Sequence, residues 1–121
     1  MEGYVVSGSW RTENQVQVWD LETGALCDTI DFEMGFKSPE PCMVYSVQFR
    51  KGTGDLILAG GSESNEARLF DRTNAYKPIC TIADMSRACY NVDFSNKGDM
   101  FALGGGDGVV RCFNIQPAGF N

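Results

Sequence analysis

The segments VVSGSWRTENQVQVWDLETGALCDTI (residues 5–30) and ILAGGSESNEARLFDRTNAYKPICTI (residues 57–82) share one layout. In each, an apolar stretch ends in small residues, a polar turn follows, and a second apolar stretch ends in an aromatic residue and aspartate. FALGGGDGVVRCFNI (residues 101–115) is a third copy, with asparagine in the last slot. Self-similarity at a spacing of tens of residues is the signature of a repeat architecture. The repeat therefore decides the fold.

A further element precedes two of the copies. VYSVQFRKGTGD (residues 44–55) matches CYNVDFSNKGD (residues 89–99), and each combines a strand-like stretch with a Gly-Asp turn. The full unit then has four strands, because short β-branched and aromatic stretches bounded by turn residues are typical of strands. We predict an all-β fold of antiparallel four-stranded units, with strands at 4–8, 16–20, 25–30, 44–49, 56–60, 66–71, 78–82, 89–94, 100–104 and 109–115.

The turns between paired strands align as well. Asn14, Asn65 and Gly108 fall at equivalent places in the three copies. These residue types tolerate the positive φ of a tight hairpin. We therefore interpret the glycine run at residues 104–108 as the end of one strand and the turn into the next. A phosphate-binding loop requires a helix behind it, and the sequence that follows is strand-like.

These residues resemble the WD-repeat β-propeller family over nearly the whole chain. Trp19-Asp20 is the signature dipeptide, DLETG (20–24) is a turn common in that family, and DGVVRCFN (107–114) follows its turn-and-strand pattern. The repeat signature comprises Trp19, Asp20, Phe70, Asp71, Asp107, Phe113 and Asn114. The aromatic–acid pairs are 51 and then 43 residues apart, near the roughly 40–45 residues of one propeller blade. Another antiparallel all-β sandwich is the alternative fold.

The chain departs from the family in one respect. It contains no histidine, so the Gly-His dipeptide and the Trp–Ser–His–Asp network of many such blades cannot form. We expect apolar packing and the sheet hydrogen bonds to stabilise the fold instead.

The repeat divides residues 1–121 into about two and a half blades. Residues 1–30 hold three strands of one blade, 31–43 an inserted loop, 44–82 a full blade, and 83–121 three strands of a last blade plus a tail. Closed propellers typically have about four to eight blades. We therefore expect the chain to be the C-terminal portion of a longer propeller, or a short protein whose ring a second subunit completes.

Composition narrows the function. The net charge of −6 disfavours nucleic acid, and the absence of a long apolar run or a signal-peptide pattern favours an intracellular, cytoplasmic protein without a membrane span. The five cysteines are separated by 15, 38, 9 and 23 positions, so no C-x-x-C pair exists for a metal. We expect reduced, buried thiols, with a disulfide or a reactive thiol as the alternative. Cys27 and Cys80 are predicted to occupy corresponding, packed places.

Catalysis is not expected. Serine and cysteine nucleophiles lack their usual histidine base, and the aspartates recur at turn slots of the repeat, where they cap turns. These aspartates are Asp20, Asp55, Asp71, Asp99 and Asp107. We predict no cofactor and no metal. Binding of a small ligand at the turn from Gly104 to Gly108 remains an alternative.

Two long connections indicate a partner-binding surface. Residues 31–43 carry about seven extra residues, because Ile30 and Val44 are 14 positions apart whereas Ile82 and Cys89 are only 7 apart. The connection 9–14 is also enlarged, and the family resemblance implies that both emerge on one face. Aromatic residues, Met and Arg are enriched at interface hot spots. We predict a surface made of Trp10, Arg11, Phe36 and Lys37.

Several alternatives remain open. Phe32, Met43, Trp10 and Phe36 are also candidates for covering the ends of the sheets. The resemblance implies a non-catalytic scaffold that binds other proteins, including the rest of the propeller or a second subunit. The alternative is a structural building block of a large cytoskeletal or filamentous assembly, held by its strand edges.

Overall fold

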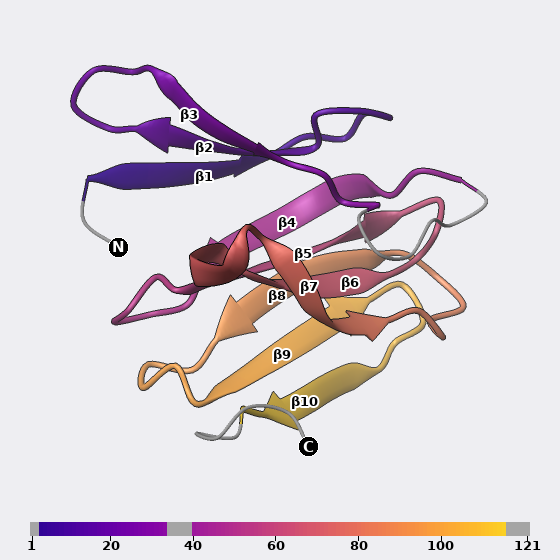
Figure 1. Cartoon of the computed structure of the whole chain (residues 1–121). Helices are drawn as coiled ribbons and strands as arrows, with labels where there is room; N and C mark the ends of the chain where they lie inside the picture. The colour runs from indigo at the N-terminus through magenta and orange to yellow at the C-terminus, as the bar shows by residue number, and fades with distance from the viewer. Residues whose placement is uncertain (1–2, 34–39, 116–121) are drawn as a thin grey trace.

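Ten strands make up most of the described chain, residues 3–33 and 40–115, in the computed structural model of the protein (Figure 1). The strands are β1 (Tyr4–Gly8), β2 (Val16–Asp20), β3 (Leu26–Ile30), β4 (Met43–Phe49), β5 (Leu56–Ser62), β6 (Ala67–Asp71), β7 (Lys77–Ile82), β8 (Cys89–Phe94), β9 (Met100–Gly105) and β10 (Val110–Asn114). A short 3-10 turn, η1 (Arg72–Asn74), precedes β7. Each predicted strand is present, with ends that differ by two residues at most.

The strands form three antiparallel sheets, which confirms the all-β class. The first sheet has the order β1-β2-β3, the second β4-β5-β6-β7 and the third β10-β9-β8. Figure 1 shows the sheets following one another down the picture, from β1–β3 at the top to β10 at the bottom. Within each sheet consecutive strands pair, so every sheet is a meander.

The pairing register gives the three sheets equivalent positions. Asp20 lies opposite Tyr4, Asp71 opposite Leu56, and Asn114 opposite Met100. The aromatic–acid pairs of the sequence therefore end the same strand in each sheet. The hairpin turns also match, because Asn14 (φ 55°), Asn65 (φ 50°) and Gly108 (φ 77°) all adopt positive φ, as predicted.

Two apolar clusters hold the sheets together. Each arises because alternate residues of a strand face the same side, so a sheet buries one set of side chains against each neighbour. The first cluster joins the first two sheets and contains Val16, Val18, Ile30, Phe32, Cys42, Val44, Ile57, Ala59 and Phe70. The second joins the last two sheets and contains Leu56, Leu58, Ala67, Leu69, Met85, Cys89, Val92, Phe94, Phe101, Leu103 and Ile115.

Matching β-bulges interrupt the sheets. In the β4–β5 pair, the register shifts between Val44 and Ser46, and in the β8–β9 pair it shifts between Cys89 and Asn91. The extra residue in each case is a tyrosine. A bulge leaves its extra residue outside the ladder and turns its side chain away from the regular alternation.

A second pair of bulges corrects the predicted equivalence of two cysteines. The register shifts where β3 pairs with β2 and where β7 pairs with β6, which places Cys27 opposite no residue in the first pair and Ile79 opposite none in the second. Cys27 therefore corresponds to Ile79, whereas Cys80 corresponds to Asp28. The prediction that Cys27 is packed is wrong: Cys27 is exposed, as is Cys112. Cys80 is half-buried, and burial raises the pKa of its thiol.

Candidate interaction surface

Every second connection emerges at the same end of the sheets. These connections, residues 9–15, 31–42, 63–66, 83–88 and 106–109, lie to the right in Figure 1 wherever they are described. The backbone N–H of Val44 donates to the carbonyl of Ser9 (3.2 Å), and the Gln15 side chain donates to the carbonyl of Cys42 (2.9 Å). The two long connections of the sequence are therefore neighbours, as predicted.

Trp10 is held at one edge and open to solvent on the rest of its ring. Its indole N–H donates to the Ser62 hydroxyl (2.8 Å), which lies in the second sheet. Its ring centroid is 6.0 Å from that of Tyr45, and 53% of the residue is exposed. A buried cover residue would not leave half of a large apolar side chain in water, so Trp10 is available to a partner.

Arg11 is exposed and makes contacts within its own hairpin. Its guanidinium donates to the carbonyl of Asn14 (2.9 Å) and to the side-chain oxygen of Gln17 (2.9 Å). Phe36 and Lys37, the other two predicted partner-binding residues, lie outside the described residues. The structure therefore places Trp10 and Arg11 on one hairpin and leaves the second half of the predicted surface undescribed.

Two tyrosines that the sequence analysis missed extend the exposed aromatic surface. Tyr45 and Tyr90 are the bulged residues of β4 and β8, and they are 47% and 52% exposed. Their ring centroids are 5.0 Å apart in an edge-to-face arrangement. Trp10, Tyr45 and Tyr90, which we call the aromatic row, thus come from the β1–β2 connection, from β4 and from β8. The aligned stretches VYS and CYN carried the signal, since tyrosine follows the first residue in both.

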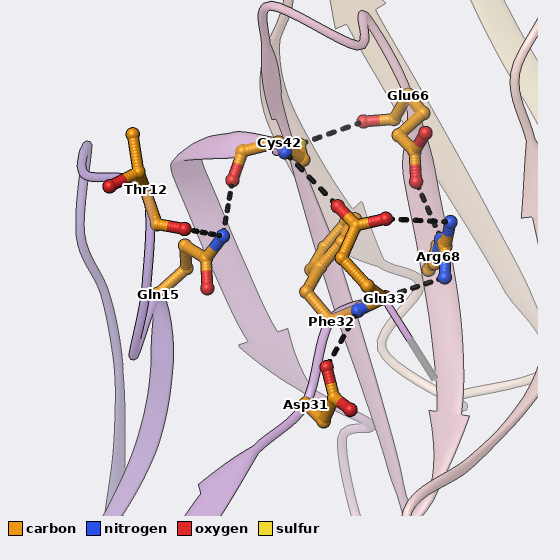
Figure 2. A network of polar contacts seen from close by, with 8 residues as sticks. All are labelled: Thr12, Gln15, Asp31, Phe32, Glu33, Cys42, Glu66 and Arg68. Carbon is orange, nitrogen blue, oxygen red and sulfur yellow. Dashed lines mark hydrogen bonds and ion pairs between the residues drawn. The ribbon is translucent and has the colours of Figure 1, made fainter. Parts of the chain in front are cut away.

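Contacts with β6 hold the base of the inserted loop (Figure 2). Phe32 is buried, with 1% exposure, and its ring meets the Phe70 ring edge to face at 5.5 Å. Arg68 of β6 is fully buried and donates to the carbonyl of Phe32 and to the Glu66 carboxylate, both at 2.5 Å. Phe32 therefore covers the core rather than binding a partner. Met43 is half-buried in β4.

Further polar contacts join the insertion to the first hairpin. The Glu33 carboxylate lies 3.8 Å from the Arg68 guanidinium and accepts from the backbone N–H of Cys42 (3.4 Å). Gln15 donates to the carbonyls of both Thr12 and Cys42, as Figure 2 shows. Burial raises the pKa of the Cys42 thiol to about 12, so it stays protonated at neutral pH.

This network corrects an expectation about stability. The sequence predicts stabilisation by apolar packing and sheet hydrogen bonds, and the structure adds a buried ion pair of Arg68 and Glu66 between the first two sheets. A buried ion pair is compatible with a folded core only where hydrogen bonds satisfy both charges. Here the carbonyl of Phe32 supplies one of those bonds to Arg68.

The repeat-signature residues perform structural roles. Trp19 donates its indole N–H to the Ser7 hydroxyl (2.9 Å) in the neighbouring strand. Asp20 accepts from the backbone N–H groups of Glu22 and Thr23, and Asp71 accepts from that of Thr73. Phe70 packs in the first cluster, and Phe113 packs against the second, with its ring stacked on Phe101 at 5.0 Å.

The glycine-rich turn satisfies its own backbone. Gly106 donates to the carbonyl of Ala88 (3.0 Å), Gly108 to that of Gly105 (3.3 Å), and Val109 to the Asp107 carboxylate (3.1 Å). The Val109 N–H and the Arg111 guanidinium hold the pKa of Asp107 below its usual value. Three N–H groups of this turn, those of Gly106, Gly108 and Val109, already have acceptors within the chain, which supports the turn interpretation of Gly104 to Gly108.

Within residues 3–33 and 40–115, no three His, Cys, Asp or Glu side chains gather closely enough to hold a metal ion. No helix in that part of the chain has the length and apolar character needed to cross a membrane. Comparison of the sequence with known protein families and with curated proteins finds no match.

Proposed function

We propose that the chain is part of a WD-repeat β-propeller and serves as a non-catalytic scaffold for protein–protein interaction. The observation that carries the scaffold role is the aromatic row, in which three large rings stay about half exposed at the end where the long connections gather. Exposed aromatic groups of this kind are enriched in protein–protein interfaces.

A series of three glycines supports the propeller architecture. Gly8, Gly60 and Gly104 occupy the same register position in the three sheets. A Cβ at Gly8 would approach Val44 of the next sheet to 2.7 Å, and a Cβ at Gly60 would approach Cys89 of the next sheet to 2.7 Å. A Cβ at Gly104 would meet nothing within 4 Å. The third sheet therefore carries glycine at the same position as the first two, and no sheet of the described chain covers it.

The opposite end of the stack has a matching open face. Ile57 and Phe101 are buried, at 0% and 2% exposure, but Val5, at the equivalent position of the first sheet, is 43% exposed. A further sheet on this face would bury Val5, as the first and second sheets bury Ile57 and Phe101. We propose that the remainder of a longer propeller, or a second subunit, supplies a sheet at each end.

The non-catalytic role is supported by what the acidic residues do. The five aspartates at turn slots all bond to turn groups: Asp20, Asp71 and Asp107 accept backbone N–H groups, Asp99 accepts from Ser95, and Asp55 from Thr53 and Arg50. Carboxylates used in this way are positioned for geometry rather than for proton transfer.

Site-specific photo-crosslinking tests the proposed role. A photoreactive amino acid replacing Trp10 should crosslink a discrete partner protein, whereas the same residue at Leu21, which is 65% exposed in the β2–β3 turn, should not. Trp10→Ala should reduce capture of that partner at least 10-fold and leave the β-sheet circular dichroism unchanged. Equal crosslinking at both positions would contradict the proposal.

The open end faces favour a second candidate, a structural building block of a large cytoskeletal or filamentous assembly. Val5 and Val110, exposed at 43% and 72%, lie on strands at the two ends of the stack. In that case, crosslinks from positions 5 and 110 would join the chain to its assembly, and position 10 would give none. The same experiment separates the two functions.

A further inference from the structure

Among the described residues, the first sheet lacks the strand that begins the other two. β4 pairs with β5 in the second sheet, and β8 pairs with β9 in the third. β1 is the counterpart of β5 and β9, because these three strands carry the equivalent glycines Gly8, Gly60 and Gly104. β2 pairs with one edge of β1, and no strand of the described chain pairs with the other. A free strand edge is a template for an extended segment of another chain.

The backbone of β1 directs alternate residues toward this free edge. Just after β1, the N–H of Ser9 donates to the carbonyl of Gln15 (2.8 Å) across the β1–β2 ladder. Hydrogen-bonded and non-hydrogen-bonded pairs alternate along an antiparallel ladder. Tyr4, Val6 and Gly8 therefore point their N–H and C=O groups away from β2. The free edge offers one donor and one acceptor from each of these residues.

A bond between the second and third sheets indicates what a strand at this edge would carry. The hydroxyl of Ser46 in β4 accepts from the backbone N–H of Val92 in β8 (3.2 Å). In the matching stretches VYSVQF and CYNVDF, the counterpart of Val92 is Val47. Within residues 3–33 and 40–115, no side chain accepts from the N–H of Val47. A small polar side chain in a strand beside β1 would supply that acceptor.

The packing of β4 and β8 defines the apolar positions of such a strand. The first, fourth and sixth residues of both stretches pack in the clusters, namely Val44, Val47 and Phe49 in β4, and Cys89, Val92 and Phe94 in β8. Transfer of the β4–β5 register to β1 places the fourth residue opposite Ser7 and the sixth opposite Val5. Val5 is 43% exposed, so an aromatic residue opposite it would cover it.

We propose that the free edge of β1 binds an extended segment of a partner protein with the pattern apolar, any residue, Ser or Asn, Val, polar, Phe. The segment runs antiparallel to β1, its Ser or Asn lies opposite Gly8 and accepts from Val47, and its Phe covers Val5. The second position is open to any residue, because Trp10 already lies beside Tyr45, where that residue would come. This inference rests on the proposed propeller architecture and specifies the strand that completes its first sheet.

A peptide titration tests the inference on the full chain. The probe is a fluorescein-labelled peptide with the sequence of residues 43–50, MVYSVQFR. The reference peptide has threonine in place of both valines and the phenylalanine, which keeps the preference for extended structure and removes the apolar face. The probe should bind at least 10-fold more tightly than the reference. Equal affinity for the two peptides, or no binding of the probe, overturns the inference.

Backbone methylation of the probe identifies the edge that it uses. In the chain, Arg50 donates its N–H to the carbonyl of Leu56 (2.8 Å), so Gln48 bonds toward β5 and the N–H of Val47 points away. In the peptide, an N-methyl group on the glutamine should therefore weaken binding at least 10-fold. The same group on the preceding valine should leave binding within about two-fold of the probe. Equal affinity of the two methylated peptides overturns the inference.

A chain variant places the peptide at β1. Val5→Asp puts a charge opposite the peptide Phe and should weaken binding at least 10-fold, whereas Leu21→Asp in the exposed β2–β3 turn should not. Undiminished binding by a folded Val5→Asp chain overturns the inference, and the methylated peptides test it on the unaltered chain if that variant does not fold.

The crosslinking experiment at position 10 distinguishes this inference from the scaffold function. If position 10 crosslinks a partner while the probe peptide does not bind, this inference fails and the scaffold function stands. If the probe binds as expected and position 10 crosslinks no partner, the scaffold function fails and the β1 edge remains a binding site.

Discussion

At the scale of single residues, the equivalent glycines Gly8, Gly60 and Gly104 differ in the atoms that an added Cβ would meet. Ala at Gly60 would bring its Cβ to 2.7 Å from the Cys89 sulfur and 3.2 Å from Val92, so the second and third sheets would have to move apart. Overpacking a core in this way costs roughly 1–3 kcal/mol. We predict that Gly60→Ala lowers the free energy of unfolding by that amount in a denaturant titration.

Gly104→Ala is the matched control. Its Cβ would meet nothing within 4 Å, and glycine in a strand costs roughly 0.5–1 kcal/mol relative to alanine. The stability of the chain by itself should therefore be unchanged or slightly increased. An equal loss of stability in the two variants would contradict the idea that Gly60 is needed for close approach of the sheets.

The thiols should react in the order of their exposure. Cys27 and Cys112 are exposed, whereas Cys42 is buried and its pKa is raised to about 12, which depletes the reactive thiolate. We predict that a bulky maleimide labels Cys27 and Cys112 within minutes in the folded chain, and Cys42 only after unfolding. Mass spectrometry of peptides from a timed reaction would check this, and rapid labelling of Cys42 would contradict it.

At the scale of elements, Arg68 joins β6 to the base of the insertion. Replacement by leucine leaves the buried Glu66 carboxylate without this guanidinium and the Phe32 carbonyl without this donor. Breaking a buried pair by removing one partner typically costs about 3–5 kcal/mol. We predict that Arg68→Leu destabilises the chain by that amount in chemical denaturation.

A double variant separates the ion pair from general packing. Arg68→Leu combined with Glu66→Leu removes both charges, so it should recover most of the stability that Arg68→Leu loses. If the double variant is as unstable as the single one, the loss comes from the shape of the site or from the Glu33 carboxylate, which also lies beside Arg68, rather than from Glu66.

The strands could be predicted from the sequence, whereas the bulges could not. Strand stretches have β-branched and aromatic residues between turn residues, and the repeat fixes their order even where a single copy is ambiguous. A bulge adds one residue without changing composition, so Tyr45 and Tyr90 looked like ordinary strand positions. The bulges in the β2–β3 and β6–β7 pairs could not be predicted either, and they explain the wrong match of Cys27 with Cys80.

The candidate surface was only partly predictable for a related reason. Trp10 and Arg11 stand out as large side chains in a lengthened polar connection, but Tyr45 reaches the surface only because the bulge redirects it. Arg68 and Glu66 look like exposed strand residues in sequence, but both are buried in contact with the base of the insertion. Contacts between segments far apart in the chain decide both outcomes.

At the scale of the whole molecule, the sheets formed by residues 3–33 and 40–115 leave exposed apolar side chains at both ends of the stack. One face of the first sheet packs on the second sheet, and the same face of the second sheet packs on the third. On the third sheet this face carries Met100, Val110 and Cys112, and all three are exposed. Exposed apolar faces and free strand edges promote association between chains. Each end therefore presents an apolar face like those through which neighbouring sheets pack inside the chain.

We predict that the 121-residue chain by itself self-associates. Sedimentation velocity should show species heavier than the 13.3 kDa monomer, in proportions that rise with concentration. Val110→Glu places a charge on the open face of the third sheet, so it should shift the distribution toward the monomer. Leu21→Glu adds the same charge in the exposed β2–β3 turn, outside the strands, and should not. A monomer at every concentration of the parent chain would mean that neither end face promotes self-association. That result would contradict the proposal that further sheets cover these faces.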